Sequence, residues 1–200
     1  MLPTTPNPWI THSSKEVFEN PYVRIVRNEV TRPSGNPGVY TVVHFKRVAV
    51  AIIPVDSEGY TWLVGQFRYA HDRYEWEVPE GGAEEGEAPE SCALRELREE
   101  AGLIAGKLTP FLEMQLSNST TDEISHSFVA TELMPTEMEP DDTEELAVHR
   151  LPLQEAFDMA LRGEIRDALS VASLLKLKCL IDDGTFDFSN KLGGSPALKR

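Results

Sequence analysis

The first half of the chain alternates between runs of β-branched and aromatic residues and short stretches of turn-forming residues. Tyr22–Val30 and Val39–Phe45 are two such runs, and the Pro- and Gly-rich segment between them predicts a loop that joins two strands. Val48–Val55 is apolar throughout, which is typical of a strand buried on both faces. Residues 1–15 are rich in Pro, Thr and Ser, so we expect them to form an irregular lead-in.

Further strands and three helices are expected downstream. The same criteria predict strands at Thr61–Phe67, Tyr74–Val78, Thr109–Gln115, Ile124–Thr131 and Leu146–Leu151. A helical segment begins at Pro89, a residue suited to the first turn of a helix, and ends at Ala101 before Gly102. Two more helices are expected at Leu153–Arg162 and Asp167–Ile181. This order predicts an α/β (α+β) fold in which a mixed β-sheet is sandwiched between helices.

The domain organisation follows from chain length and element order. The 200 residues suit one α/β domain with a small N-terminal addition, and no internal repeat or long linker divides the chain. We therefore expect an N-terminal antiparallel β extension at residues 1–46, the main domain at residues 47–184 and a loosely ordered tail at residues 185–200.

Charge and cysteine usage narrow the functional classes. With 33 acidic and 19 basic residues, the net charge of -14 argues against nonspecific binding to nucleic acid or to an anionic membrane. A small anionic substrate is compatible with this charge if a divalent metal inverts the local field. Cys92 and Cys179 have no CxxC spacing, which indicates neither a zinc site nor a disulfide framework. With no evident signal peptide or membrane-spanning run, we expect a cytoplasmic protein.

The segment GGAEEGEAPESCALRELREEAGL, at residues 81–103, contains the candidate chemistry. Glu96, Glu99 and Glu100 are spaced i, i+3 and i+4, so they share one face of the predicted helix. Each like-charge pair there costs about 0.2–0.5 kcal/mol, whereas a hard cation such as Mg²⁺ binds clustered carboxylate oxygens. A second stripe, spaced i, i+3 and i+7, is expected to face the core and comprises Leu94, Leu97 and Ala101.

The complete spacing in this segment resembles the Nudix box, with no departure at a defining position. Its fixed positions are Gly81, Glu87, Arg95-Glu96-Leu97, Glu99-Glu100 and Gly102-Leu103. WEVPEGG, just before the box, resembles the strand and Pro-x-Gly turn of ADP-ribose-pyrophosphatase-like members of that family. The resemblance implies a Nudix fold and Mg²⁺-dependent hydrolysis of the diphosphate bond of a nucleoside diphosphate sugar, with Mn²⁺ as an alternative metal.

The resemblance also implies roles for individual residues. Glu96 and Glu100 would be metal ligands, Glu99 a third ligand or an adjacent group, and the main-chain carbonyl of Glu80 would complete the metal site. The subgroup often has alanine at the position of Glu80, a difference that does not affect a backbone ligand. Residues expected to hold the loop and helix together are Gly81, Glu87, Arg95 and Gly102.

A general base and two arginines are expected around this metal centre. Residues 139–145 form an acidic loop where the subgroup often supplies an additional base, with Glu144 the first choice and Glu145 the second. Arg47 and Arg68 match positions where the subgroup places arginines near the diphosphate or the terminal ribose. A planar guanidinium suits this role because it binds phosphate oxygens in pairs.

Two further features concern substrate binding and assembly. Glu77, within WEVPEGG, is another candidate for substrate binding. In relatives the N-terminal strands cross to a partner subunit and supply an aromatic that helps to sandwich the base, a role that Tyr22 or Phe18 could take. Two predicted strands before residue 46 exceed what a minimal Nudix core needs, so we also expect a homodimer.

The substrate and the class of activity leave alternatives open. Relatives that resemble ADP-ribose pyrophosphatases commonly have a proline some 15 residues past the box, whereas this chain has SNSTTDE at residues 117–123. GDP-mannose and ADP-glucose therefore stand beside ADP-ribose as expected substrates, and another nucleoside diphosphate derivative is an alternative. A noncatalytic nucleotide-sugar sensor is the rival function, but the complete acidic set and the lack of a basic helix-turn-helix favour an enzyme.

Overall fold

The computed structural model describes residues 2, 4–139 and 145–188. The chain divides into two compact units. The first unit comprises residues 1–47 together with the loop segment 115–123. The second unit comprises residues 48–114 and 124–200 and contains the Nudix-like segment.

The first unit is built on an antiparallel sheet with the strand order β1-β2-β3. The strands are β1 (Ile10–Glu19), β2 (Val23–Thr31) and β3 (Pro37–Phe45). The expectation of an irregular lead-in over residues 1–15 was wrong for the part that forms β1. Every residue of β1 is exposed, so the strand carries no alternation of apolar and polar positions, and its pairing with β2 determines its conformation.

The loop segment 115–123 lies along the free edge of β3. The backbone N–H of Val43 donates to the carbonyl of Thr120 at 2.9 Å. The carboxylate of Asp122 accepts from the backbone N–H of Phe45 at 3.0 Å and contacts Nδ1 of His44 at 2.6 Å. These contacts hold the SNSTTDE loop, which the sequence associates with substrate choice, against the N-terminal sheet.

The second unit contains two sheets with the strand orders β7-β4-β9-β8 and β10-β5-β6. Their strands are β4 (Ala49–Pro54), β5 (Tyr60–Arg68), β6 (Arg73–Glu77), β7 (Glu80–Gly82), β8 (Leu103–Gln115), β9 (Ile124–Pro135) and β10 (Ala147–Pro152). Strand β4 pairs in parallel with β9 and antiparallel with β7, so this sheet is mixed. The apolar sequence of β4 matches its burial in the interior of the unit.

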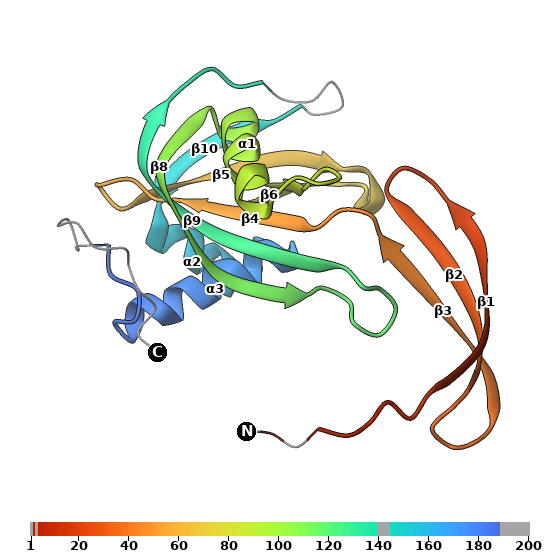
Figure 1. The fold of residues 1–200 in the computed structure, drawn as a ribbon. Helices are drawn as coiled ribbons and strands as arrows, with labels where there is room; N and C mark the ends of the chain where they lie inside the picture. Colours follow the sequence, from red (N-terminus) through yellow and green to blue (C-terminus); the bar gives the residue numbers. More distant parts are fainter. Residues whose placement is uncertain (1, 3, 140–144, 189–200) are drawn as a thin grey trace. The chain divides into compact units, whose positions relative to one another are not determined.

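Helices cover both faces of the mixed sheet. Figure 1 shows α1 (Pro89–Ala101) on one side of β4 and β9, with α2 (Leu153–Arg162) and α3 (Ala168–Asp182) on the other. A short 3₁₀ helix spans Tyr69–His71. The expected mixed sheet between helices and the expected antiparallel N-terminal extension are thus confirmed. Among the described residues, no helix combines the length and apolarity needed to span a membrane.

Helix α1 packs on the sheet through small residues. Pro89 occupies the first turn, and Gly102 ends the helix in the left-handed conformation at φ 62°. The buried positions of the helix are Cys92, Ala93, Leu97, Glu100 and Ala101. Leu94 is 42% exposed, so its assignment to the core-facing stripe was wrong. Cys92, Ala93, Leu97 and Ala101 share one buried cluster with residues of β4 and β9, and Leu94 is not part of it.

Candidate active site

The short strand β7 brings the box glycine, Gly81, against the helix. A Cβ atom on Gly81 would lie 2.0 Å from Oε1 of Glu96, so a side chain here would force that carboxylate to move. In the following loop, the backbone N–H of Glu84 donates to Oε2 of Glu87 at 2.8 Å, and the N–H of Glu87 donates to the carbonyl of Glu84 at 2.9 Å. Gly86 takes a φ of 80° between them, a conformation that favours glycine.

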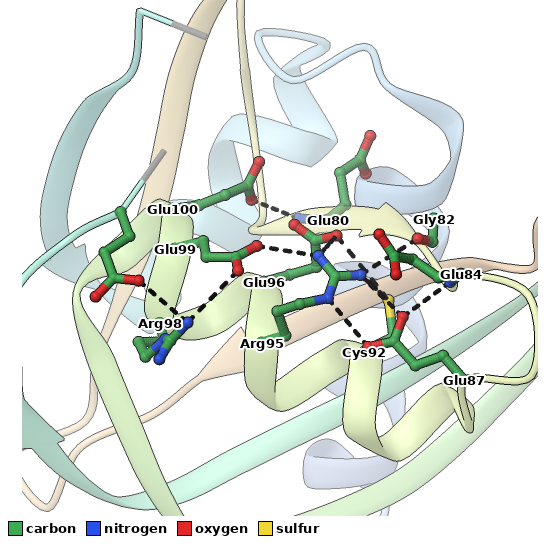
Figure 2. Close-up of polar contacts among 11 residues, drawn as sticks. Glu80, Gly82, Glu84, Glu87, Cys92, Arg95, Glu96, Arg98, Glu99 and Glu100 are labelled. Carbon is green, nitrogen blue, oxygen red and sulfur yellow. Dashed lines mark hydrogen bonds and ion pairs between the residues drawn. The ribbon is translucent and has the colours of Figure 1, made fainter. Parts of the chain in front are cut away.

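Arg95 connects this loop to the acidic face of α1, as Figure 2 shows. Its Nε and Nη2 atoms donate to the two carboxylate oxygens of Glu87, each at 3.0 Å. Its Nη1 atom donates to Glu96 at 2.7 Å and to Glu99 at 3.0 Å, and Nη2 reaches the carbonyl of Gly82 at 3.3 Å. The hydrogen bonds to Glu87 contribute most to raising the pKa of Arg95 above its usual value. The guanidinium therefore stays charged. The arrangement agrees with an organising role for Arg95 and Glu87.

Glu100 lies deeper than the other two carboxylates of the helix. It is 1% exposed, and its Oε2 accepts the backbone N–H of Glu80 at 2.8 Å. The side chains of Glu96 and Glu99 are 12% and 24% exposed, respectively. Within residues 4–139 and 145–188, no group of three or more His, Cys, Asp or Glu side chains is arranged to hold a metal ion. The carboxylates of Glu96 and Glu99 instead bind the Arg95 guanidinium.

A second charged cluster lies between β5, β6 and β7. Arg68 makes a two-point contact with Glu77: Nε donates to one oxygen at 3.0 Å and Nη2 donates to the other. Gln66 donates to the same carboxylate at 2.7 Å, and Nη2 of Arg68 also donates to Oε1 of Glu80 at 3.0 Å. Glu77 is 1% exposed, so this carboxylate lies beneath Arg68. The structure therefore places three of the candidate residues, Arg68, Glu77 and Glu80, in one network.

Burial and neighbouring carboxyl groups both disfavour the charged forms of the glutamates in this second cluster. Burial raises the pKa of Glu80 well above its usual range, and the neighbouring carboxylates of Asp167 and Glu77 raise it further, against the opposing effect of Arg68. Burial likewise raises the pKa of Glu77, although Arg68 lowers it. Oε2 of Glu80 is buried and accepts no hydrogen bond from the residues that the structure describes. Three carboxyl groups, those of Glu77, Glu80 and Asp167, therefore share the surroundings of one arginine.

The other candidate residues belong to the first unit, to the segment before β10 or to residues that the structure does not describe. Tyr22 and Arg47 both belong to the first unit, where Cζ of Arg47 lies 5.5 Å from the centroid of the exposed Tyr22 ring. Glu144 lies outside the described residues, and Glu145 is exposed just before β10. Phe18 is exposed on β1.

The sequence interpretation missed two residues of the second cluster. Gln66 stands two positions before Arg68 on the same strand, so strand alternation alone places both side chains on one face. Asp167 caps α3 by accepting the backbone N–H of Ser170 at 2.6 Å. An Asp just before an apolar helical segment can be predicted as a helix cap. The proximity of Asp167 to Glu80 depends on the tertiary fold, so no local sequence pattern predicts it.

Comparison with known proteins identifies the family. The NUDIX domain model matches residues 45–174, and the chain belongs to the Nudix family. A second model, the nucleoside diphosphate sugar hydrolase N-terminal domain, matches residues 9–43. These matches confirm the resemblance inferred from the box and make the protein a Nudix pyrophosphohydrolase by family.

Relatives and a solved structure extend this result. An "ADP-ribose pyrophosphatase" of Bacillus subtilis is 34% identical over 170 residues, which cover 84% of this chain and 91% of the relative. One of Mycobacterium tuberculosis is 33% identical over 82% of this chain and 81% of the relative. A crystal structure of an ADP compounds hydrolase matches with a TM-score of 0.80 at 23% identity, covering 90% of this chain and 98% of that one. This last likeness supports the fold alone.

Proposed function

We propose that this Nudix enzyme hydrolyses the diphosphate bond of a nucleoside diphosphate sugar to a nucleoside monophosphate and a sugar phosphate. The observation that carries the proposal is the acidic face of α1 beside Gly81 of β7, where Arg95 binds Glu96 and Glu99 of the helix and Glu87 of the preceding loop. The match of residues 9–43 to the N-terminal domain of nucleoside diphosphate sugar hydrolases supports the substrate class. The names of the two bacterial relatives support ADP-ribose as one substrate to test.

The proposed cofactor is Mg²⁺, with Mn²⁺ as an alternative. Glu96, Glu99 and Glu100 would hold it together with the main-chain carbonyl of Glu80. These groups are hard oxygen donors of the kind that Mg²⁺ binds, and they come from one face of α1 and from the adjacent strand β7. Glu96 and Glu99 bind Arg95 in this structure, so they would have to turn toward the ion to hold it. When bound, the ion would neutralise charge on the diphosphate and lower the pKa of a water.

The residues of the chain would position these donors and the substrate. The Glu80 N–H fixes the buried carboxylate of Glu100, and Arg95 fixes those of Glu96 and Glu99. Arg68 would contact a phosphate oxygen, with Glu77 acting through it by holding the guanidinium in place.

Other candidate residues would supply the general base and contact the nucleotide. Glu144 would be the general base, with Glu145 as the second choice. Arg47 and the aromatic ring of Tyr22 or Phe18 would contact the nucleotide. Residues 1–46 would form the dimerising extension and residues 47–184 the catalytic domain. The expected tail at residues 185–200 lies outside the described residues from residue 189 onward.

A substrate panel tests the proposed function. Purified protein would be incubated with ADP-ribose, GDP-mannose, ADP-glucose and UDP-glucose, with and without Mg²⁺, and the products separated by ion-exchange chromatography. We expect Mg²⁺-dependent release of a nucleoside monophosphate from at least one of them. The Glu100→Gln variant serves as the matched inactive control. Binding of these compounds without turnover by the unmodified protein would instead favour the noncatalytic sensor.

A further inference from the structure

Glu80 faces two parts of the site at once. Its backbone N–H binds Glu100, and its side chain binds Arg68. In Figure 2 the Glu80 side chain points away from Arg95, while its backbone nitrogen lies toward Glu100. The backbone contact accounts for a role in positioning Glu100, but it leaves the carboxylate itself without a function.

The donors of Arg68 show what the Glu80 carboxylate occupies. A guanidinium has two edges that can bind a pair of oxygens, one formed by Nε and Nη2 and one formed by Nη1 and Nη2. Glu77 binds the Nε–Nη2 edge. Oε1 of Glu80 takes the remaining hydrogen of Nη2, at 3.0 Å, which is half of the Nη1–Nη2 edge. Among the described residues, no hydrogen bond from Nη1 of Arg68 is found.

The second edge of Arg68 is therefore half occupied. The Arg68 side chain is 37% exposed, so a ligand can reach part of it. A phosphate that binds both Nη1 and Nη2 has to displace Oε1 of Glu80. Oε2 of Glu80 is buried near the carboxyl group of Asp167 and accepts no hydrogen bond from a described donor, so Glu80 holds Arg68 through Oε1 alone.

We propose that the Glu80 carboxylate is an internal competitor of the substrate diphosphate for the Nη1–Nη2 edge of Arg68, and thereby limits how tightly the site binds its substrate. The inference rests on the proposed function, since it needs a diphosphate ligand near Arg68. Glu77 holds the other edge of the same guanidinium, so the Nη1–Nη2 edge is the one for which Glu80 and a phosphate compete.

The test is equilibrium binding of ADP, which carries a diphosphate but no second sugar, measured by titration calorimetry in the presence of Mg²⁺. We expect Glu80→Ala to lower the Kd for ADP by about tenfold, because one donor of the Arg68 guanidinium is released from its internal acceptor. Glu80→Gln, which keeps the shape of the side chain, should lower the Kd by a smaller factor. The control is Glu85→Ala, which removes an exposed carboxylate from the loop that follows β7. It should change the Kd for ADP by less than about twofold.

A double-mutant cycle assigns the effect to Arg68. In an Arg68→Lys background, which keeps the charge but lacks the paired edge, Glu80→Ala should change the Kd by less than about twofold. In steady-state assays on a hydrolysed substrate, Glu80→Ala should lower KM more than it changes kcat. An unchanged or raised Kd for ADP in both folded Glu80 variants would overturn the inference. Hydrolysis of a nucleoside diphosphate sugar by the unmodified protein tests the proposed function. The Kd values of the Glu80 variants test this inference separately.

Discussion

The backbone N–H of Glu80 donates to Oε2 of Glu100 at 2.8 Å, which joins the short strand β7 to the most deeply buried carboxylate of α1. A carboxylate in such surroundings needs donors or a cation to offset the loss of hydration. The contact fixes one oxygen of Glu100 through the main chain, so its position does not depend on which side chain stands at position 80. That independence explains how a glutamate can stand where relatives of the subgroup often have alanine.

Replacement of Glu100 by Gln should abolish most of the activity and keep the fold. The amide has the same shape, and its carbonyl oxygen can still accept the Glu80 N–H, but it lacks the charge that a Mg²⁺ ligand supplies. We expect kcat to fall by about a hundredfold or more, with the far-ultraviolet circular dichroism spectrum unchanged. Glu90→Gln, an exposed residue of the same helix, is the matched control. Near-normal turnover of Glu100→Gln at saturating Mg²⁺ would exclude Glu100 as a metal ligand.

Removal of the Arg95 guanidinium should destabilise the metal-free protein. Arg95→Ala leaves Glu87, Glu96 and Glu99 in mutual repulsion at partly buried positions, and we expect a loss of about 1–3 kcal/mol in the free energy of unfolding. Arg98→Ala is the control, because Arg98 contacts Glu99 at 3.6 Å on the more exposed side of the helix. It should lose less than about 0.5 kcal/mol. Urea denaturation with a chelator present compares the two variants, and equal losses would contradict the organising role of Arg95.

A methyl group at position 81 should affect activity more than stability. The new Cβ would meet Oε1 of Glu96, the mobile end of a side chain, so the carboxylate can move aside but leaves its position beside Arg95. We expect Gly81→Ala to lower kcat by about tenfold or more, since a displacement of about 1 Å has effects of that size. The melting temperature should change little. A control is Gly81→Ala in a Glu96→Ala background, where the methyl group should cause no further loss of activity.

The sequence predicted the elements whose signals are local. Strand β4 was predicted from its apolar run, because a strand buried on both faces is apolar throughout. The ends of α1 were predicted from Pro89 and Gly102, because these residue types are typical of the first turn and the end of a helix. Strand β1 was not predictable, since its polar residues form a strand through pairing with β2. The spacing of the Nudix box indicated which glutamates gather on α1. It could not indicate that Glu80 shares Arg68 with Glu77, because that contact joins three strands.

The contact between Asp122 and the N-terminal sheet should depend on pH. Burial raises the pKa of Asp122, but the hydrogen bonds from His44 and from the Phe45 N–H outweigh it, and the net pKa lies below the usual 3.8. A carboxyl with a lowered pKa in the folded state stabilises the fold above its unfolded pKa, and this contribution is lost as the pH falls through the folded value. Asp122→Asn should therefore lower the melting temperature slightly near pH 6, and the difference from the unmodified protein should shrink below about pH 4.

The matched control for this pH dependence is Glu16→Gln, which removes an exposed carboxylate from β1. It should lower the melting temperature by less than Asp122→Asn at pH 6. Melting curves for both variants and the unmodified protein, collected from pH 3 to pH 7, give the comparison. The melting temperature of Asp122→Asn should approach that of the unmodified protein as the pH falls. A gap between the two melting temperatures that widens toward low pH would contradict the stabilising contact.

The protein should be a homodimer, with the first unit as the contact region. Strand β1 exposes apolar side chains, among them Val17 and Phe18, on an edge of the N-terminal sheet. An exposed edge strand with apolar residues is suited to pairing with another chain. Light scattering at micromolar concentration should give about twice the chain mass of 22.3 kDa. Val17→Lys combined with Phe18→Glu should shift the mass toward that of one chain, whereas Leu161→Lys, at an exposed apolar position on α2, should not. A single-chain mass for the unmodified protein would refute the dimer.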